Sequence, residues 1–413
     1  SSHGPPPRAD VRFSHFGGPE DFKFWQQTIA DFQRANPAIR VRQVFFEGRD
    51  IQCDTPFPRQ IVSEALTEVT LLDLAAFREF SDRFENLSAL KVGTSFDGLE
   101  SIGLRAFQVQ HGQLGIPFSG TNLLIFLNRK AFQKASEFHG KPVPLPGEDW
   151  TVAQFLRTAE ALTCDFDRNG QTDQFGLWLP RWEYYLPFIW SFGTDITDEQ
   201  ASQWTFSGHA AQSVMRFYRQ LATGDRVAPR EEEVSPLSQD MGFLTGKTAM
   251  CVNGPGFLPI LDKSDMAGNY AVAPIPRGPG GRATRIRWDG IVMQKNLSPE
   301  RRDKAWRFME WTLSKEVQGR FARLGRALPA RVDVQEEFVA ADPPRCKPFV
   351  DALAYSRLQP PLPQFEALDR AITRHFEEAI DPSRAFDALT MLNALARDPA
   401  LISAFPGSPR EAP

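Results

Sequence analysis

The sequence has little of what redox and metal chemistry require. Its 413 residues include six histidines and four cysteines, and no two cysteines form a C-x-x-C pair. Such wide spacing allows two disulfides but favours free, mostly buried thiols. The four are Cys53, Cys164, Cys251 and Cys346. We therefore expect no cofactor apart from one ion, which is considered below.

Enzyme motifs are also missing. The chain has no G-x-S-x-G, no P-loop, no H-E-x-x-H and no G-x-G-x-x-G after a strand. The nearest match, HFEE at residues 375–378, lacks the second histidine of a zinc site. No pair of carboxylates stands out as a glycosidase couple. A carbohydrate hydrolase is thus the least supported class, and we expect a protein that is not an enzyme.

Neither charge nor a long apolar run singles out a macromolecular partner. The net charge of −4 gives no reason to expect nucleic acid, and no apolar run approaches the roughly 20 residues of a spanning helix. The opening SSHGPPPRAD has no apolar signal segment, and residues 1–4 resemble a tag remnant before a mature N-terminus. We expect that a leader or lipid-anchor segment has been removed.

The first residues that are informative form a β-α-β pattern. Residues 11–16 alternate like a strand, apolar residues then recur at helical spacing from Asp21 to Phe32, and residues 39–45 alternate again. This order predicts an α/β fold with a parallel sheet, whose ligands bind near the carboxyl ends of the strands. His15, Phe16 and Gly17 stand at such an end.

Aromatic residues are abundant, with 34 Phe and nine Trp. Most must lie in the core, but seven rings crowd into residues 178–192 beside hydrogen-bonding groups such as Glu183. Flat rings next to fixed donors and acceptors suit a sugar, whose C–H faces lie on rings. We expect one or two of these rings to contact ligand, and Trp182 is the first choice.

One segment is typical of a calcium loop. Residues 165–173, DFDRNGQTD, fit the first nine positions of such a loop. The twelfth position is Gly176, so the usual bidentate glutamate is absent and a ligand from elsewhere is needed. The alternative is an Asx-rich turn without an ion. The candidate ligands of a structural Ca²⁺ are Asp165, Asp167, Asn169, Gln171 and Asp173.

Several segments, read in order, resemble extracellular solute-binding protein family 1, the sugar-binding components of ABC importers typified by maltose-binding protein. They are GIPF at 115–118 with LIFLNRKAF at 124–132, DWTVAQF at 149–155, the loop at 165–176, FLTGKTAM at 243–250 with NGP at 253–255, PIPRGPGG at 274–281, WDGIVM at 288–293 and AWRFMEWTLS at 305–314. Each is weak alone, but their order and spacing extend over residues 11–330.

The resemblance implies a type II periplasmic-binding-protein fold. Two α/β lobes, each a mixed, mostly parallel sheet flanked by helices, would close on ligand about a hinge. The lobes would be discontinuous in sequence, with residues 10–119 and 290–328 in the first and residues 124–287 and 331–413 in the second. The crossings would lie near residues 119–124, 287–291 and 328–331.

Positions that match the family's motifs nominate ligand contacts. They are His15, Phe16, Gly17, Phe118, Ser119, Asn122, Trp182, Glu183, Gly254, Phe257, Arg287, Trp288, Asp289 and Arg326. Three alternatives stay open, because Phe257 can pack in the core, Arg287 can pair with Asp289, and His15 can be a satisfied strand-end histidine. The chain also departs from the family, with Gly256 where a tryptophan often follows Gly-Pro and no tryptophan in residues 71–80, where Phe77 or Arg78 would substitute.

The resemblance implies a binding protein that captures a mono- or oligosaccharide and delivers it to the transmembrane subunits of an ABC permease. It would work as a monomer, in the periplasm or at the outer face of the cytoplasmic membrane. The alternative ligand is anionic, such as a glycerophosphodiester or a sugar phosphate, because Arg285, Arg287 and Arg326 suit a phosphate group.

Overall fold

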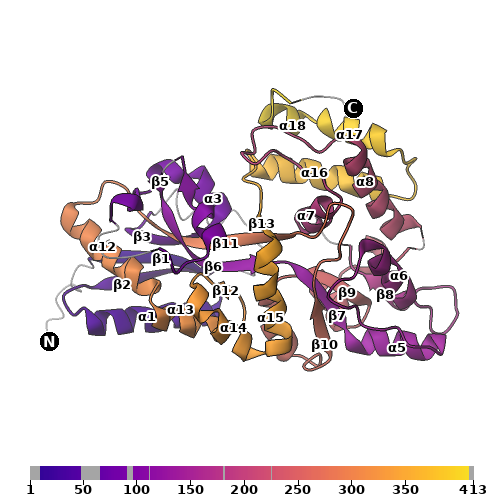
Figure 1. Ribbon diagram of the computed structural model, residues 1–413, viewed down its shortest axis with the longest axis horizontal. Helices are drawn as coiled ribbons and strands as arrows, with labels where there is room; N and C mark the ends of the chain where they lie inside the picture. Colours follow the sequence, from indigo (N-terminus) through magenta and orange to yellow (C-terminus); the bar gives the residue numbers. More distant parts are fainter. Residues whose placement is uncertain are drawn as a thin grey trace. The chain divides into compact units, whose positions relative to one another are not determined.

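The computed structural model describes residues 10–47, 66–90, 96–110, 112–179, 182–224 and 226–408. The chain divides into two compact units, the first made of Ser1–Thr121 and Arg287–Asp342 and the second of Asn122–Ile286 and Pro343–Pro413. Figure 1 follows the chain by colour, so indigo and orange segments lie together in the first unit. Each unit combines a β-sheet with helices, and each is described by itself.

The third boundary differs from the expectation. The first two divisions fall between Thr121 and Asn122 and between Ile286 and Arg287. The last falls at Asp342 and not at residues 328–331. Residues 332–341 stay with the first unit because η4 (Val332–Val334) and α14 (Gln335–Ala341) pack against α13 (Lys315–Ala322).

The first unit is built on the predicted β-α-β start. β1 (Val11–Gly17) and β2 (Val41–Glu47) pair in parallel with Val11 opposite Val41, and α1 (Pro19–Ala35) connects them. β3 (Val69–Asp73) lies on the other side of β1, also in parallel. The strand order is β12-β6-β11-β3-β1-β2, with β6 at Gly115–Asn122, β11 at Thr284–Met293 and β12 at Leu328–Pro329. β11 runs antiparallel to β3.

Buried aromatic rings fill the space between this sheet and its helices. Trp25 of α1 lies 4.7 Å from the ring of Phe13 and 4.8 Å from that of Phe118, measured between centroids. Phe308 packs on Phe13 from α12 (Pro299–Thr312). Ser298 is the N-cap of α12, and its hydroxyl accepts a hydrogen bond from the Arg301 amide.

The second unit has a sheet of its own, with the order β10-β7-β9-β8. Its strands are β7 (Leu124–Asn128), β8 (Phe175–Leu177), β9 (Thr248–Asn253) and β10 (Tyr270–Ala273). β7 pairs antiparallel with both β9 and β10, and only β8 and β9 are parallel. The sheet is mixed as expected, but antiparallel pairs prevail in this unit, because its strands are not joined by simple β-α-β crossovers.

The other elements cover the sheets or connect their strands. In the first unit they are α3 (Leu74–Glu79), η1 (Ser81–Arg83), η2 (Leu87–Leu90), α4 (Ser101–Ala106), β4 (Gln108–Val109), β5 (Gly112–Gln113), β6 (Gly115–Asn122) and β12 (Leu328–Pro329). In the second they are α5 (Arg129–His139), α6 (Val152–Leu162), α7 (Trp182–Ser191), α8 (Gly208–Thr223), α9 (Glu231–Val234), α10 (Gln239–Leu244), η3 (Pro255–Phe257), α11 (Leu258–Asp262), α15 (Pro343–Asp351), η5 (Ala352–Tyr355), β13 (Ser356–Leu358), α16 (Phe365–Ile380), α17 (Ala388–Ala396) and α18 (Pro399–Ala404).

Close packing of β8 on α6 requires a glycine. A Cβ atom on Gly176 would lie 2.1 Å from the carbonyl oxygen of Ala159. Backbone cannot move aside as the end of a flexible side chain can, so even one methyl group must push the helix and the strand apart.

We expect Gly176→Ala to lower the free energy of unfolding by about 1–3 kcal/mol. The matched control is Gly147→Ala, because nothing lies within 4 Å of a Cβ atom built on Gly147. Urea unfolding followed by tryptophan fluorescence measures both variants. Equal midpoints for the two variants would contradict the packing described here.

Candidate functional site

His15 lies at the carboxyl end of β1 and is fully buried. Its Nε2 is 2.8 Å from Nε2 of Gln43, and its ring stacks on Phe13. Burial lowers the pKa of His15 to about 4, so the ring is neutral at pH 7. His15 is thus a buried strand-end histidine whose ring nitrogen has a partner within the protein. The next residue, Phe16, is half-buried.

The turn after β1 is held by a carboxylate. Gly17 has φ +135°, and a Cβ atom there would lie 2.3 Å from Oδ2 of Asp21, so only glycine fits. The same oxygen accepts a 2.9 Å hydrogen bond from the Gly18 amide at the start of α1. Arg326 donates to both carboxylate oxygens of Asp21, one of them at 3.1 Å. Gly17 and Arg326 are thereby brought together by Asp21, which the sequence analysis did not nominate.

Two further carboxylates lie on adjacent strands of the same unit. Asp73 ends β3, and its register partner on β11 is Asp289. Oδ1 of Asp73 accepts a 2.8 Å hydrogen bond from the Ala76 amide and so caps α3. Burial raises the pKa of Asp289 to about 7, and the negative charge of Asp73 acts in the same direction. Arg287, two residues earlier on the same face of β11, opposes this shift.

Other nominated residues of the first unit lie in the core. Trp288 is fully buried, and a Cβ atom on Gly120 would be 3.0 Å from its ring. Since successive side chains of a strand alternate, Trp288 points to the face of β11 opposite Arg287 and Asp289. Phe118 is 1% exposed, and its ring contacts Trp25. Ser119 is also buried. These side chains support the strands and present no surface within this unit.

The expected substitutes for the missing tryptophan differ from each other. Phe77 is fully buried against Phe84 and Phe107, so it serves the core. Arg78 is half-buried and donates to the Ala106 carbonyl over 3.4 Å. Phe77 therefore supplies no stacking ring for a ligand.

In the second unit, the segment NGPG after β9 forms a tight turn. The side chain of Asn253 accepts a 2.8 Å hydrogen bond from the Gly254 amide and donates one of 3.0 Å to Asp240. Pro255 then starts η3, and the Phe257 ring packs on Phe126 at 5.2 Å. Phe257 is 2% exposed, so the core placement that the sequence left open is the one found.

The remaining nominated residues of this unit have different settings. Asn122 is fully buried and donates a 2.9 Å hydrogen bond to the carbonyl of Phe349. Trp182 and Glu183 form the first turn of α7, but their side chains lie outside the described part of the chain. Their role stays a prediction.

Sequence reasoning missed a row of arginine–aromatic contacts in the second unit. Arg285 is buried, lies 5.5 Å from the ring of Tyr184 and donates to Gln359 over 3.2 Å. Arg357, its register partner on β13, lies 4.5 Å from the ring of Trp190 and forms an ion pair with Asp195 at 2.5 Å. The aromatic cluster was visible in the sequence, but its arginine partners come from strands 100 or more residues away.

The calcium-like loop brings its three aspartates together. Ligand atoms of Asp165, Asp167 and Asp173 all lie within 4.8 Å of one another. Although burial raises the pKa of Asp165, hydrogen bonds from the Gly170 and Asn169 amides lower it below its usual range. Carboxylate oxygens at this spacing fit a hard cation.

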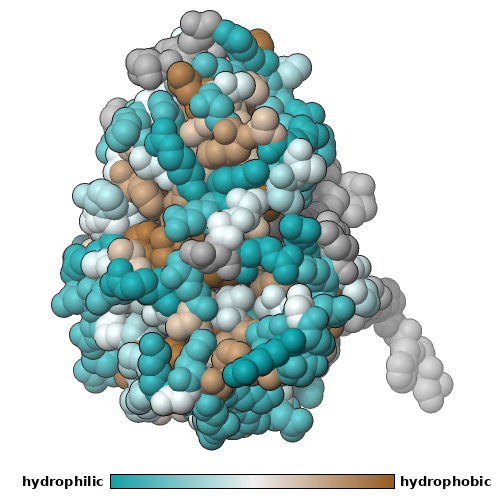
Figure 2. All heavy atoms as spheres, turned by 90° about the vertical axis from the view of Figure 1, so that its right-hand side faces the viewer, coloured by the Kyte–Doolittle hydropathy of each residue, from teal (hydrophilic) through white to brown (hydrophobic). Residues whose placement is uncertain are grey.

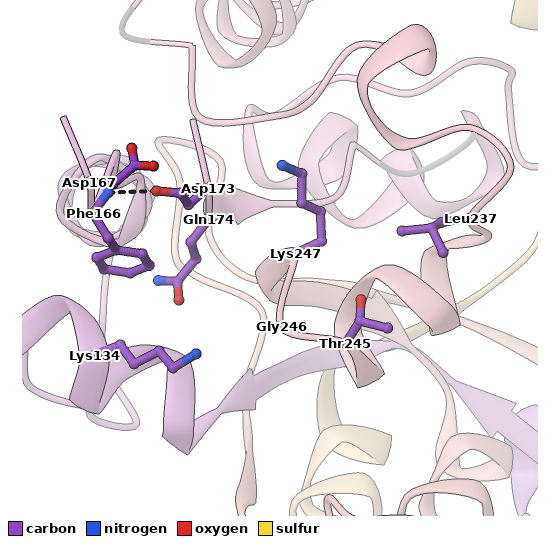
Figure 3. Close-up of a pocket in the computed structure, with 9 residues that line it drawn as sticks. All are labelled: Lys134, Phe166, Asp167, Asp173, Gln174, Leu237, Thr245, Gly246 and Lys247. Carbon is purple, nitrogen blue, oxygen red and sulfur yellow. Dashed lines mark hydrogen bonds between the residues drawn. The ribbon is translucent and has the colours of Figure 1, made fainter. Parts of the chain in front are cut away.

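Gly176 explains why the twelfth loop position carries no glutamate. The Ala159 backbone occupies the place of any side chain there. A cavity of about 570 Å³ adjoins the loop (Figure 3). Its lining residues are Lys134, Phe166, Asp167, Asp173, Gln174, Leu237, Thr245, Gly246 and Lys247. The dashed line in Figure 3 joins the Phe166 amide to Asp173, so that carboxylate is partly committed to the loop itself.

The sheets and the charged groups at strand ends define an α/β protein of the two-lobe binding-protein class. The family described as bacterial extracellular solute-binding protein matches residues 59–346, more than half of the chain, and the protein belongs to this family. Its members are substrate-binding proteins and not enzymes. None of the helices in the described ranges is long and apolar enough to span a bilayer.

Solved structures share the fold at low sequence identity. An ABC substrate-binding protein, Lmo0181 from Listeria monocytogenes in complex with cycloalternan, is 18% identical with a TM-score of 0.78, over 93% of this chain and 96% of that one. The GacH receptor of Streptomyces glaucescens, solved unliganded and in complex with acarbose, is 20% identical with a TM-score of 0.75, over 96% of this chain and 98% of that one. UgpB from Mycobacterium tuberculosis in complex with glycerophosphocholine is 22% identical with a TM-score of 0.74, over 95% of this chain and 97% of that one.

The buried, neutral His15 makes stability depend on pH. Its folded pKa of about 4 lies below the ordinary value of 6.5, so the unfolded chain binds the proton first and stability falls as pH drops from 6.5 through 4. We expect wild type to lose up to about 3 kcal/mol relative to His15→Gln over this range. His209→Gln, at an exposed position, is the control. Urea unfolding at several pH values measures the free energy of unfolding of each variant. Equal losses of stability in wild type and His15→Gln would show that His15 does not cause the pH dependence.

Proposed function

We propose that this protein is the solute-binding component of an ABC importer that captures a mono- or oligosaccharide and delivers it to a membrane permease. One observation carries the proposal: in the first unit, the turn after β1 and the strands β3 and β11 gather Asp21, Asp73, Arg287, Asp289 and Arg326. Family membership and relatives solved with cycloalternan or acarbose support it.

The chemistry of these groups suits a polyol. Carboxylate oxygens accept hydrogen bonds from hydroxyl groups, and guanidinium groups donate hydrogen bonds in a fixed plane. Phe16, which is half-buried at the end of β1, adds an apolar surface for the C–H face of a sugar. Capture by hydrogen bonds and hinge closure needs no catalytic group.

An anionic ligand is the second candidate, and the glycerophosphocholine complex of UgpB favours it. The arginines that motivate it are largely engaged, however. Arg326 is held by Asp21, and Arg285 is buried against Tyr184 and Gln359. Carboxylates beside Arg287 would also repel a phosphate, so a neutral sugar is the better match.

The setting of the protein follows from the same proposal. It would work in the periplasm or at the outer face of the cytoplasmic membrane, free or as a lipoprotein, and as a monomer. Figure 2 supports the last point in part, because the face it draws is mostly hydrophilic and its apolar atoms form small separate groups.

Isothermal titration calorimetry tests the function. We expect maltotetraose or another member of a neutral oligosaccharide panel to bind, with glucose 6-phosphate binding at least about tenfold more weakly, a difference of about 1.4 kcal/mol. Arg287→Gln separates the candidates, because an anionic ligand would lose affinity selectively in this variant. A folded protein that binds no sugar of the panel would contradict the proposal.

We also propose a structural Ca²⁺ held by Asp165, Asp167 and Asp173, with Asn169 and the carbonyl of Gln171 as further ligands. The ion would offset the repulsion among three carboxylates within 4.8 Å. It would serve stability and not ligand capture.

Thermal unfolding with and without metal tests this ion. At a Ca²⁺ concentration 100 times Kd we expect a gain of about 2.7 kcal/mol, seen as a Tm rise of a few degrees that EDTA reverses. Asp165→Asn should abolish the rise, whereas Asp303→Asn, at an exposed position of α12, should keep it. No rise at 10 mM CaCl₂, about tenfold above the Kd of the weakest extracellular sites, would dismiss the ion.

A further inference from the structure

The cavity beside the loop at residues 165–173 lies within the second unit, at one edge of its sheet. Its lining residues Gln174 and Lys247 directly precede β8 and β9, respectively. These two strands are parallel, so the cavity adjoins their amino ends. The NGPG turn follows β9 at the other edge, roughly 20 Å away along a strand of six residues. With a volume of about 570 Å³, the cavity has the size of a small-molecule site, and it shares no residue with the charged groups of the first unit.

Gln174 presents a buried carbonyl oxygen to this cavity. Its side chain is 2% exposed, and its Nε2 donates to the carbonyls of Leu162 over 2.8 Å and of Ala131 over 3.2 Å. Two acceptor partners fix which end of the amide is the nitrogen, so the oxygen points away from them. Figure 3 shows the side chain extending toward Lys134. No donor in the described ranges bonds this oxygen, and a buried acceptor is costly until water or a ligand supplies a donor.

Two lysines from different elements bring positive charge to the cavity. Lys247 is half-buried, and its Nζ donates over 2.9 Å to the Thr172 carbonyl and lies 5.3 Å from the centroid of the Phe175 ring. Gly246, with φ +77°, allows the turn that places Lys247 there. An ammonium group has three donors, so the bond to Thr172 leaves Lys247 able to bind a ligand as well. Lys134 of α5 is exposed and lines the cavity from another element (Figure 3).

The charges of the lining residues favour a ligand with one negative charge. Lys134 and Lys247 are balanced by Asp167 and Asp173, so each negative charge of a ligand is in excess and a dianion is disfavoured relative to a monoanion. The two carboxylates are engaged by their own loop, because Asp173 accepts a 2.7 Å hydrogen bond from the Phe166 amide and Asp167 accepts bonds from within residues 165–173. The ammonium groups are therefore the charged groups that a ligand meets.

We infer that this cavity binds a small monoanionic carboxylate that carries hydroxyl groups, such as a sugar acid. The carboxylate accepts hydrogen bonds from Lys134 and Lys247, and a hydroxyl group donates to the carbonyl oxygen of Gln174. The Phe166 ring offers an apolar surface for the carbon chain. The site is additional to the capture of the transported sugar, so the inference goes beyond the proposed function and does not rest on it.

Calorimetry with three six-carbon probes tests the chemistry, in EDTA so that Ca²⁺ plays no part. D-gluconate has a carboxylate and hydroxyl groups, sorbitol has hydroxyl groups alone, and hexanoate has a carboxylate alone. We expect D-gluconate to bind and the other two to bind at least about tenfold more weakly, because each lacks one of the two groups. Glucose 6-phosphate, a dianion at pH 8, should also bind more weakly. No binding of D-gluconate, or binding no tighter than that of any other probe, would overturn the inference.

Two lysine variants locate the site. Lys134→Gln and Lys247→Gln should each weaken D-gluconate binding at least about fivefold and leave maltotetraose binding as in wild type. The matched control is Lys141→Gln, an exposed position of the same unit that does not line the cavity and should keep wild-type affinity for D-gluconate. Because Lys134 is exposed, its variant stays informative even if Lys247→Gln perturbs the loop through the lost bond to Thr172. Unchanged affinity in Lys134→Gln would place D-gluconate elsewhere and refute the cavity site.

The two proposals fail separately. If maltotetraose and the other neutral sugars do not bind but D-gluconate binds in a way that depends on Lys134, the sugar proposal is wrong and the cavity site stands. If a neutral sugar binds and D-gluconate does not, the cavity site is wrong and the sugar proposal stands.

Discussion

Burial of the Trp288 ring fixes which face of β11 carries its charged residues. Successive side chains of a strand point to opposite faces, so a tryptophan packed against Gly120 obliges Arg287 and Asp289 to share the other face. The register of β11 with β3 then places Asp289 opposite Asp73. A shift by one residue would exchange the tryptophan with the charges, and neither would tolerate its new surroundings.

The carboxylates of the first unit have different surroundings. Asp21 is committed three ways, to the Gly18 amide and to two donors of Arg326, and it stabilises the turn after β1. Asp289 lies opposite Asp73 in the strand register, and burial together with the charge of Asp73 raises its pKa to about 7. Buried charge is costly unless it is paired, and the raised pKa of Asp289 reflects that cost.

Much of the local structure could be predicted from the sequence. The alternation of residues 11–16 and the apolar spacing after Asp21 are local signals, and each describes the element found. The candidate site was harder, because single positions were taken from motif matches. Phe118, Phe257 and Trp288 are large apolar residues near strand ends, and only packing shows that their rings fill the cores. Asp21 and Asp73 gave no motif signal at all.

The sequence by itself determined the α/β class, the β-α-β start and the likeness to solute-binding proteins, because periodicity and ordered motifs are properties of neighbouring residues. Tertiary structure alone decided the partners: Arg326 with Asp21, 305 positions apart, and Asp289 with Asp73 across two strands. Charge pairing and burial depend on distance in space, and the chain brings such residues together only when its strands and helices have packed.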